Sequence, residues 1–308
     1  MITTHAPIPV VKQRTAALSI ISNSTLIVVK VIAGTLTGSV AILTDAVHSS
    51  IDLIASVVAF VSIRKADEPA DESHRYGHEK IENISAALEG ILILVGSAVI
   101  VFEAVRRLIN GGNVHNAGIG LVVLASSLIL NVVVSTVIGR TAAETESAAL
   151  ESDAAHLRTD AMTSGGVLVG LALVDITHEQ WIDPVVALLV AFSIVFTGVK
   201  LLRRSTGVLV DAALPDEEVG EIRAAIERFG PRGVVGYHEL RTRRAGARRY
   251  VDLHVQFRAG TSLEDAHRMA HELQDEIAAQ IARADVLIHL EPEDRVRPGE
   301  ELPGVTSG

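Results

Sequence analysis

Apolar residues in the first two thirds of the chain gather into six long segments, which short polar stretches separate. A helix needs about 20 mainly apolar residues to cross a hydrocarbon core of about 30 Å, and each segment meets or approaches that length. The segments cover Thr15–Gly34, Ser39–Ile63, Ile84–Phe102, Ala117–Ile138, Ser147–Val174 and Ile182–Leu202. The pattern therefore predicts six transmembrane helices in a lipid bilayer.

The residues after Arg204 follow a different, charged pattern of shorter elements. LPDEEVGEIRAAIERF starts with proline and acidic residues, which are typical of a helix N-terminus. The stretches GVVGYHELRTRR and RRYVDLHVQFR alternate polar and apolar residues and predict a hairpin. A capped amphipathic helix, SLEDAHRMAHELQDEIAAQIA, and a short strand, ADVLIHLEP, follow. This α-β-β-α-β order predicts a small sheet with both helices packed on one face.

The expected fold is an all-α membrane domain of six helices followed by an α+β domain, which the family resemblance described below implies to be metallochaperone-like. We expect a tail at 1–14, the membrane domain at 15–206, the α+β domain at 207–293 and a disordered tail at 294–308. The opening residues, MITTHAPIPVVKQR, lack the apolar core of a cleaved export signal. Short cytoplasmic loops are enriched in Lys and Arg. Most Lys and Arg residues of the short loops in this chain lie on the same side of the membrane as both termini, so we expect both termini to be cytoplasmic.

Composition narrows the chemistry of the chain. Hydrophobic residues make up 48% and mean hydropathy is +0.37, which does not suit a water-soluble globule. The chain has no cysteine, so disulfides, thiolate metal sites and cysteine nucleophiles are excluded. A net charge of −10 argues against a nucleic-acid partner, which needs a basic surplus. The arginine-rich stretch RTRRAGARR, with only Tyr250 beside it for stacking, fits a solvated or lipid-headgroup surface better.

Two of the membrane segments each carry a histidine and an aspartate four residues apart. His48 and Asp52 lie in TDAVHSSID, and His156 and Asp160 lie in HLRTD. Residues at i and i+4 share a helix face, so each pair can offer two ligands to one point. A single residue of this kind can also serve as a helix–helix hydrogen bond or ion pair. The same spacing occurring twice favours a tetrahedral site of two imidazoles and two carboxylates, which suits Zn²⁺.

Three more charged residues fall inside the apolar segments. Asp45 precedes His48 by about one helical turn, and both direct ligation and a structural or proton-path role remain open for it. For Lys30 and Glu89 we expect structural pairing or snorkelling of the charged end toward water.

These residues resemble the cation diffusion facilitators, a family of divalent-metal/proton antiporters. The resemblance extends from about Arg14 to Glu293, and GTLTGSVAILTDAVHSSID, PADESHRYGHEKIE and ESDAAHLRTDAMTS carry it. It implies a homodimer that exports Zn²⁺ in exchange for protons by alternating access. It also implies a transport site formed by His48, Asp52, His156 and Asp160. Within the family this ligand set is associated with zinc, and Cd²⁺, Fe²⁺, Mn²⁺ and Co²⁺ remain alternative cargoes.

The resemblance also implies metal sites outside the membrane. Asp71, His74 and His78, spaced three and four residues apart, would form a loop site at the membrane–cytosol boundary. Lys80 and Asp211 would form a salt bridge between the domains. A binuclear regulatory site in the α+β domain, which would sense metal and support dimerisation, would comprise His238, His254, His267, His289 and Glu291. His271, four residues after His267, is an alternative ligand.

Two other classes of membrane protein fit less well. A metallohydrolase of the H-E-x-x-H type is not expected, because HEKIE and HELQD lack the second histidine, and we expect no enzyme. A passive cation channel would show carbonyl loops or rings of charge lining a pore. We therefore expect a transporter in the inner membrane of a bacterium.

Overall fold

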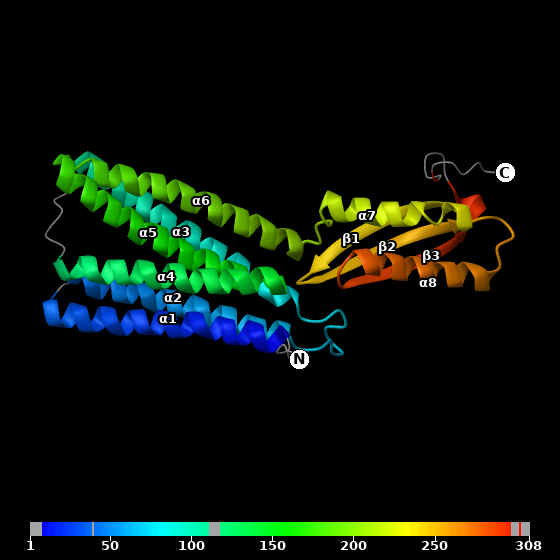
Figure 1. Ribbon diagram of the computed structural model, residues 1–308, viewed down its shortest axis with the longest axis horizontal. Coiled ribbons are helices and arrows are strands. Elements are labelled where there is room, and N and C mark those ends of the chain that lie inside the picture. The colour runs from blue at the N-terminus through cyan, green and yellow to red at the C-terminus, as the bar shows by residue number, and fades with distance from the viewer. Residues whose placement is uncertain (1–7, 39, 111–117, 297–301, 303–308) are drawn as a thin grey trace, which may run out of the picture. The chain divides into compact units, whose positions relative to one another are not determined.

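The computed structural model of the chain describes residues 8–38, 40–110, 118–296 and 302. The chain divides into two compact units, Met1–Thr206 and Gly207–Gly308. Unit 1 contains six long helices, which are labelled in Figure 1: α1 (Ile8–Thr37), α2 (Val40–Ala66), α3 (Lys80–Asn110), α4 (Gly118–Thr145), α5 (Ala148–Thr177) and α6 (Ile182–Leu209). All six are long and apolar enough to cross a membrane, so the six-helix fold class is confirmed.

The helices extend beyond the apolar segments that predicted them. α1 begins at Ile8 instead of Thr15, and α4 continues to Thr145 instead of Ile138. Hydrophobicity indicates only the part of a helix that lies in lipid, whereas hydrogen bonds within the backbone let the helix continue through polar residues. α5 begins after an N-terminal cap, since the Ser147 hydroxyl accepts a hydrogen bond from the Leu150 amide at 3.3 Å.

Two apolar clusters hold the helices of unit 1 together. The larger one joins α1, α2, α4 and α5 and includes Ile63, Ile138 and Leu157. The smaller one joins α3 and α6 through Ile93 and Ile194. Figure 1 shows α4 beside α1, and α6 running with α3 and α5. The chain therefore builds a four-helix group against which α3 and α6 pack.

Unit 2 has the predicted α-β-β-α-β order. Its elements are α7 (Asp216–Glu227), β1 (Val234–Ala245), β2 (Arg248–Phe257), α8 (Leu263–Gln280) and β3 (Ala284–Pro292). The sheet has the order β1-β2-β3, with β1 antiparallel and β3 parallel to β2. Short 3₁₀ turns follow α7 at Gly230–Arg232 and β3 at Glu293–Arg295.

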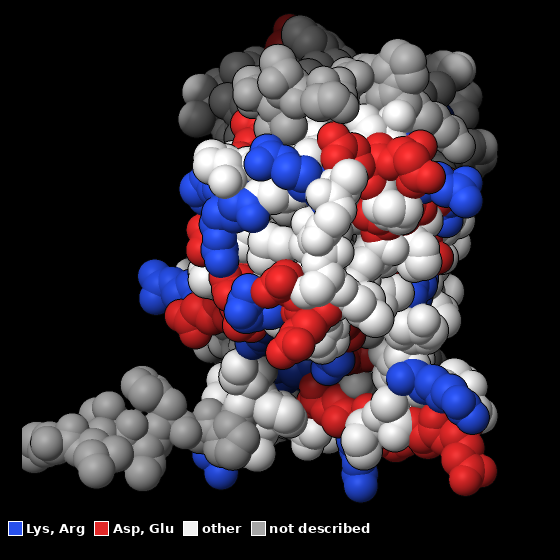
Figure 2. Space-filling model, turned by 90° about the vertical axis from the view of Figure 1, so that its right-hand side faces the viewer, with Lys and Arg blue, Asp and Glu red and all other residues white. Residues whose placement is uncertain are grey.

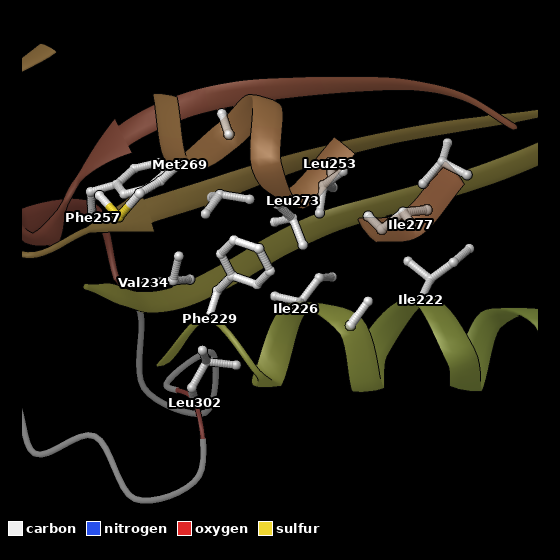
Figure 3. Close-up of a cluster of buried hydrophobic side chains, with 14 of the residues drawn as sticks. Ile222, Ile226, Phe229, Val234, Leu253, Phe257, Met269, Leu273, Ile277 and Leu302 are labelled. Carbon is white, nitrogen blue, oxygen red and sulfur yellow. The ribbon is translucent and has the colours of Figure 1, made fainter. Parts of the chain in front are cut away.

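The core of unit 2 lies between one face of the sheet and both helices. Alternate residues of β2, among them Leu253 and Phe257, are buried together with residues of α7 and α8. Figure 3 shows Ile222 and Ile226 of α7 meeting Leu273 of α8 in this core. The intervening residues of β2 point to the opposite face, which is free for polar side chains.

Part of the C-terminal tail packs on unit 2. Of the tail expected to be disordered, residues 297–301 and 303–308 lie outside the described residues. Leu302 is buried in the core of unit 2, and its amide donates to the Val235 carbonyl at 3.0 Å. Figure 2 shows a face on which Lys and Arg side chains are interspersed with Asp and Glu side chains.

Candidate metal centres

Helices α2 and α5 bring Asp52, His156 and Asp160 together inside unit 1. His156 Nε2 lies 3.1 Å from Asp52 Oδ1 and 3.8 Å from Asp160 Oδ2. One ligand atom from each of the three residues lies within 4.8 Å of the other two. Asp52 and His156 are only 6% and 8% exposed. This membrane cluster offers one imidazole nitrogen and two carboxylates to a single divalent cation.

His48, the fourth predicted ligand, is not in the membrane cluster. It lies on α2 about one turn before Asp52, and its side chain is exposed. It remains close enough to Asp160 to act on that carboxylate electrostatically. The structure therefore brings together three of the four residues, with His48 at the edge.

Asp45 and Lys30 form an ion pair between α1 and α2. Lys30 Nζ lies 2.8 Å from Asp45 Oδ2 and donates to Ser49 Oγ at 2.8 Å. Lys30 is 6% exposed, so it pairs as expected and does not snorkel. Asp45 is thus engaged by a cation of the protein, which favours its structural role over ligation.

Of the two alternatives expected for Glu89, pairing and snorkelling, the structure excludes the second. Its side chain on α3 does not snorkel, since the residue is 2% exposed, and it interacts inside the bundle with the Ser152 hydroxyl and with His156. Asp153 on α5, which the sequence analysis passed over, is equally buried and close enough to interact with Glu89 electrostatically. In the sequence, Glu89 and Asp153 stand out only as acidic residues within long apolar helices.

The loop between α2 and α3 brings together Asp71, His74 and His78. His78 Nε2 lies 3.3 Å from Asp71 Oδ2, and His74 Nδ1 lies 3.5 Å from Asp71 Oδ1. Ligand atoms of all three lie within 4.8 Å of one another. Gly77, at a φ of 88°, supplies the left-handed turn that lets both histidines point to one place.

The electrostatics of the loop suit a cation. The hydroxyl of Ser73 and the amides of His74 and Ser73 donate to Asp71, which lowers the pKa of its carboxyl to about 2. Asp71 is therefore a charged ligand at every physiological pH. His78 is 4% exposed, and neither ring nitrogen has a hydrogen-bond partner among the described residues. A buried imidazole of this kind is available as a ligand.

His238, His254 and Glu291 meet on the open face of the sheet in unit 2. Glu291 Oε2 lies 2.8 Å from His238 Nε2, and Glu291 Oε1 lies 2.9 Å from His254 Nδ1. The strand register explains the cluster, because His254 stands opposite both His238 and His289. His289 is more distant, with its Nε2 4.0 Å from Glu291 Oε1.

Burial raises the pKa of Glu291, but hydrogen bonds from His238 and His254 outweigh that effect and lower the pKa to about 2. The carboxylate is therefore ionised and available to a metal. Two neighbours of this site escaped the sequence analysis. Gln256, which is fully buried, donates to Glu291 Oε2 at 3.4 Å, and Glu239 Oε2 lies 3.8 Å from His254 Nε2. Glu239 sits in a β-bulge with a φ of 49°, which no sequence pattern indicated.

His267 is separate from this site. It lies on α8, which packs against the other face of the sheet, and its Nε2 is 3.1 Å from that of His271. The structure therefore groups His267 with the alternative ligand. The Lys80–Asp211 bridge stays a prediction: Lys80 begins α3 in unit 1, and Asp211 in unit 2 lies 3.6 Å from the Arg243 guanidinium.

Comparisons with known proteins identify the family of the chain. The family profile "Cation efflux transmembrane domain" matches residues 16–210, and "Cation efflux protein, cytoplasmic domain" matches residues 214–293. An uncharacterized transporter of Synechocystis is 35% identical over 83% of this chain and 83% of its own length. The cation-efflux pump FieF of Citrobacter koseri is 31% identical over 91% of this chain and 92% of its own. The metal-bound C-terminal domain of the CzcD transporter from Thermotoga maritima is 28% identical, with a TM-score of 0.25, over 26% of this chain and 93% of that chain. The chain belongs to the cation diffusion facilitator family: it is a multi-pass membrane protein and a transporter for the efflux of divalent cations.

Proposed function

We propose that the protein exports Zn²⁺ from the cytosol in exchange for protons, by alternating access, as a homodimer. The observation that carries the proposal is the buried cluster of Asp52, His156 and Asp160. Charged groups in the middle of a membrane are costly unless they serve a transport path. A site closed on most sides also fits a carrier better than an open channel.

Zinc is the proposed cargo because of the donor set. One imidazole and two carboxylates, with His48 about one turn before Asp52 as the fourth ligand of the proposed site, match the tetrahedral preference of Zn²⁺. Metals that prefer soft ligands would be held best by thiolates, and the chain has no cysteine. The alternative cargoes are Cd²⁺, Fe²⁺, Mn²⁺ and Co²⁺. Measuring how strongly each ion inhibits zinc uptake into reconstituted vesicles ranks them against zinc.

Proton coupling follows from the same ligands. An imidazole must be neutral to bind a metal, and it titrates near pH 6.5 when unperturbed. Protons from an acidic exterior therefore compete with the metal for His156 and the carboxylates around it. The outward-open site releases Zn²⁺ as it takes up protons, and the metal-free site returns them to the cytosol.

The sites outside the membrane are proposed to regulate transport. Asp71, His74 and His78 would bind cytosolic zinc weakly, and His238, His254, His289 and Glu291 would bind it in unit 2. Because α8 packs on the opposite face of the sheet, His267 can join the unit 2 site only from a second chain. Metal binding would then bring two cytoplasmic domains together and bias the membrane helices, a coupling between distinct sites.

The proposed orientation places both termini in the cytoplasm of a bacterium with the protein in its inner membrane. Arg64 and Lys65 at the end of α2 support it, since short cytoplasmic loops are enriched in basic residues.

The experiment is a flux assay on the purified protein in proteoliposomes that contain a zinc indicator and a pH indicator. We expect zinc uptake to move protons in the opposite direction and to accelerate when a pH gradient is imposed. Zinc flux that follows its own gradient with no proton movement contradicts antiport and favours the passive channel.

A further inference from the structure

Two exposed histidines stand next to each other on α8, apart from the three metal centres described above. His267 and His271 are four residues apart, so they lie one above the other on the same side of the helix. Their rings meet edge to face, with centroids 4.4 Å apart, and the two Nε2 atoms are 3.1 Å apart. The two nitrogens therefore point to one place.

The distance between the two nitrogens suits a bound metal ion. Imidazole nitrogens bind Zn²⁺ at about 2.0–2.1 Å, so an ion equally far from both Nε2 atoms would form an N–metal–N angle of about 98° at the observed separation. Lengthening the separation to about 3.3 Å would give the full tetrahedral angle. The two side chains thus need to move only slightly to bind one ion together.

A hydrogen bond between the rings is the alternative explanation of the short distance. It requires that one ring carry its proton on Nε2 and the other on Nδ1. Both residues are exposed, so water competes for this bond and its contribution to stability is small. α8 does not depend on it, because the opposite side of the helix is anchored in the core by Met269, Leu273 and Ile277. Packing therefore gives no reason for the two histidines, whereas metal binding does.

The charge along this side of α8 also favours a cation. Glu264 precedes His267 by three residues and Asp275 follows His271 by four, so both acids share the exposed side that carries the histidines. α8 contains a single Lys or Arg, Arg268, whose guanidinium donates to Asp265 at 2.5 Å.

We propose that His267 and His271 form a metal site of their own, the α8 site, in which both imidazoles of one chain bind a divalent ion that prefers nitrogen ligands, such as Zn²⁺, through Nε2. Water molecules complete the coordination. The cluster of His238, His254 and Glu291 lies on the open face of the sheet and α8 packs on the other face, so the α8 site is separate from this sheet site. An ion in the α8 site occupies the His267 nitrogen that the sheet site of a second chain would need. The α8 site therefore competes with ligation across two chains, and it does not require the protein to export zinc.

The test is protection by zinc against diethyl pyrocarbonate, a reagent that modifies accessible imidazoles, in the full-length protein in nanodiscs. Trypsin cleaves after Arg258, Arg268 and Arg283, so His267 and His271 fall in separate peptides, 259–268 and 269–283, each with one histidine. Mass spectrometry of these peptides follows each histidine by itself. We expect Zn²⁺ to block modification of both with the same midpoint concentration. Mg²⁺, which prefers oxygen ligands, should block neither.

Three variants distinguish a site within one chain from ligation across two chains. His271→Ala should raise the zinc midpoint for protection of His267 by about tenfold or more, since loss of an outer-shell partner alone lowers metal affinity about 10–100-fold. His289→Ala weakens the sheet site and should leave that midpoint unchanged. Leu263→His, added to His271→Ala, places a histidine four residues before His267 at an exposed position, and should restore the midpoint toward that of wild type.

Two results overturn the α8 site. If zinc protects neither peptide, the two rings are only hydrogen-bonded to each other. If protection of His267 survives His271→Ala unchanged but is lost in His289→Ala, His267 binds in the sheet site of a second chain. Zinc transport is not measured in this assay, so neither result bears on the proposed export.

Discussion

Removing Lys12 should destabilise unit 1 far more than removing a surface lysine. Lys12 Nζ lies 2.5 Å from Asp67 Oδ1 and 2.8 Å from Glu82 Oε1, so it connects α1 with the end of α2 and the start of α3. The three side chains are only 5 to 12% exposed. Glu82 also accepts a hydrogen bond from the Ser147 hydroxyl at 2.5 Å, which adds the start of α5 to the network.

Truncating one partner of a buried ion pair costs about 3–5 kcal/mol, because the remaining charge is left without compensation. We expect Lys12→Met to fall near the lower limit, at about 3 kcal/mol, since Ser147 still donates to Glu82. A domain of about 200 residues shifts its melting temperature by about 2–4 °C per kcal/mol, which gives a decrease of about 6–12 °C.

The assay is thermal unfolding of the purified protein in detergent, followed by size-exclusion chromatography. Lys65→Met is the matched control, because the Lys65–Glu68 pair is about half exposed and worth about 0–1 kcal/mol. The double variant Lys12→Met/Glu82→Gln should recover part of the loss. If Lys12→Met has the same melting temperature as Lys65→Met and wild type, the network contributes nothing to stability and the reasoning fails.

Three further predictions concern other parts of the chain. Ser262→Ala removes the hydroxyl that accepts from the Asp265 amide at the start of α8, and should lower the free energy of unfolding of unit 2 by about 1 kcal/mol in thermal melts. The pKa of Glu291 is about 2 in the folded protein and 4.5 in the unfolded chain. Its ionised carboxylate therefore stabilises metal-free unit 2 at pH values above 4.5, and this contribution is lost as the pH falls toward 2. In Glu291→Gln, the loss in free energy of unfolding between pH 4.5 and pH 2 should therefore be smaller than in wild type by about 1 kcal/mol after solvent screening, as measured by circular dichroism. His78→Leu keeps the burial of the ring and removes only its 3.3 Å contact with the half-exposed Asp71 carboxylate, so it should change the melting temperature of zinc-free protein little, while reducing the increase that zinc produces.

The sequence predicted the fold well because each element has a local signal. Long apolar segments predicted the six membrane helices, and alternation in RRYVDLHVQFR predicted β2 and its two faces. Helix ends were less predictable. α1 starts at Ile8 because intrahelical hydrogen bonds carry it past the apolar segment through polar residues such as Lys12, which a buried ion pair accommodates.

The candidate sites were predictable as far as helical and strand spacing determine direction. The i, i+4 rule placed Asp160 near His156, and facing pairs were expected to add Asp52 and His48, but spacing could not tell that His48 lies outside the cluster with its side chain exposed. That depends on how α2 is rotated against its neighbours, which is a property of tertiary packing. The choice between pairing and snorkelling for Glu89 stayed open for the same reason, since a charge in an apolar helix gives no sign of whether it reaches water.

The central claim is that Asp52, His156 and Asp160 hold the transported ion, and zinc-driven proton flux tests it most directly. The measurement uses proteoliposomes containing wild type, Asp160→Ala or, as a control that removes an exposed carboxylate of α3, Glu103→Gln, at matched protein density. We expect zinc and proton flux to vanish together in Asp160→Ala and to persist in Glu103→Gln. Zinc-driven proton flux at the wild-type rate in Asp160→Ala would contradict the claim.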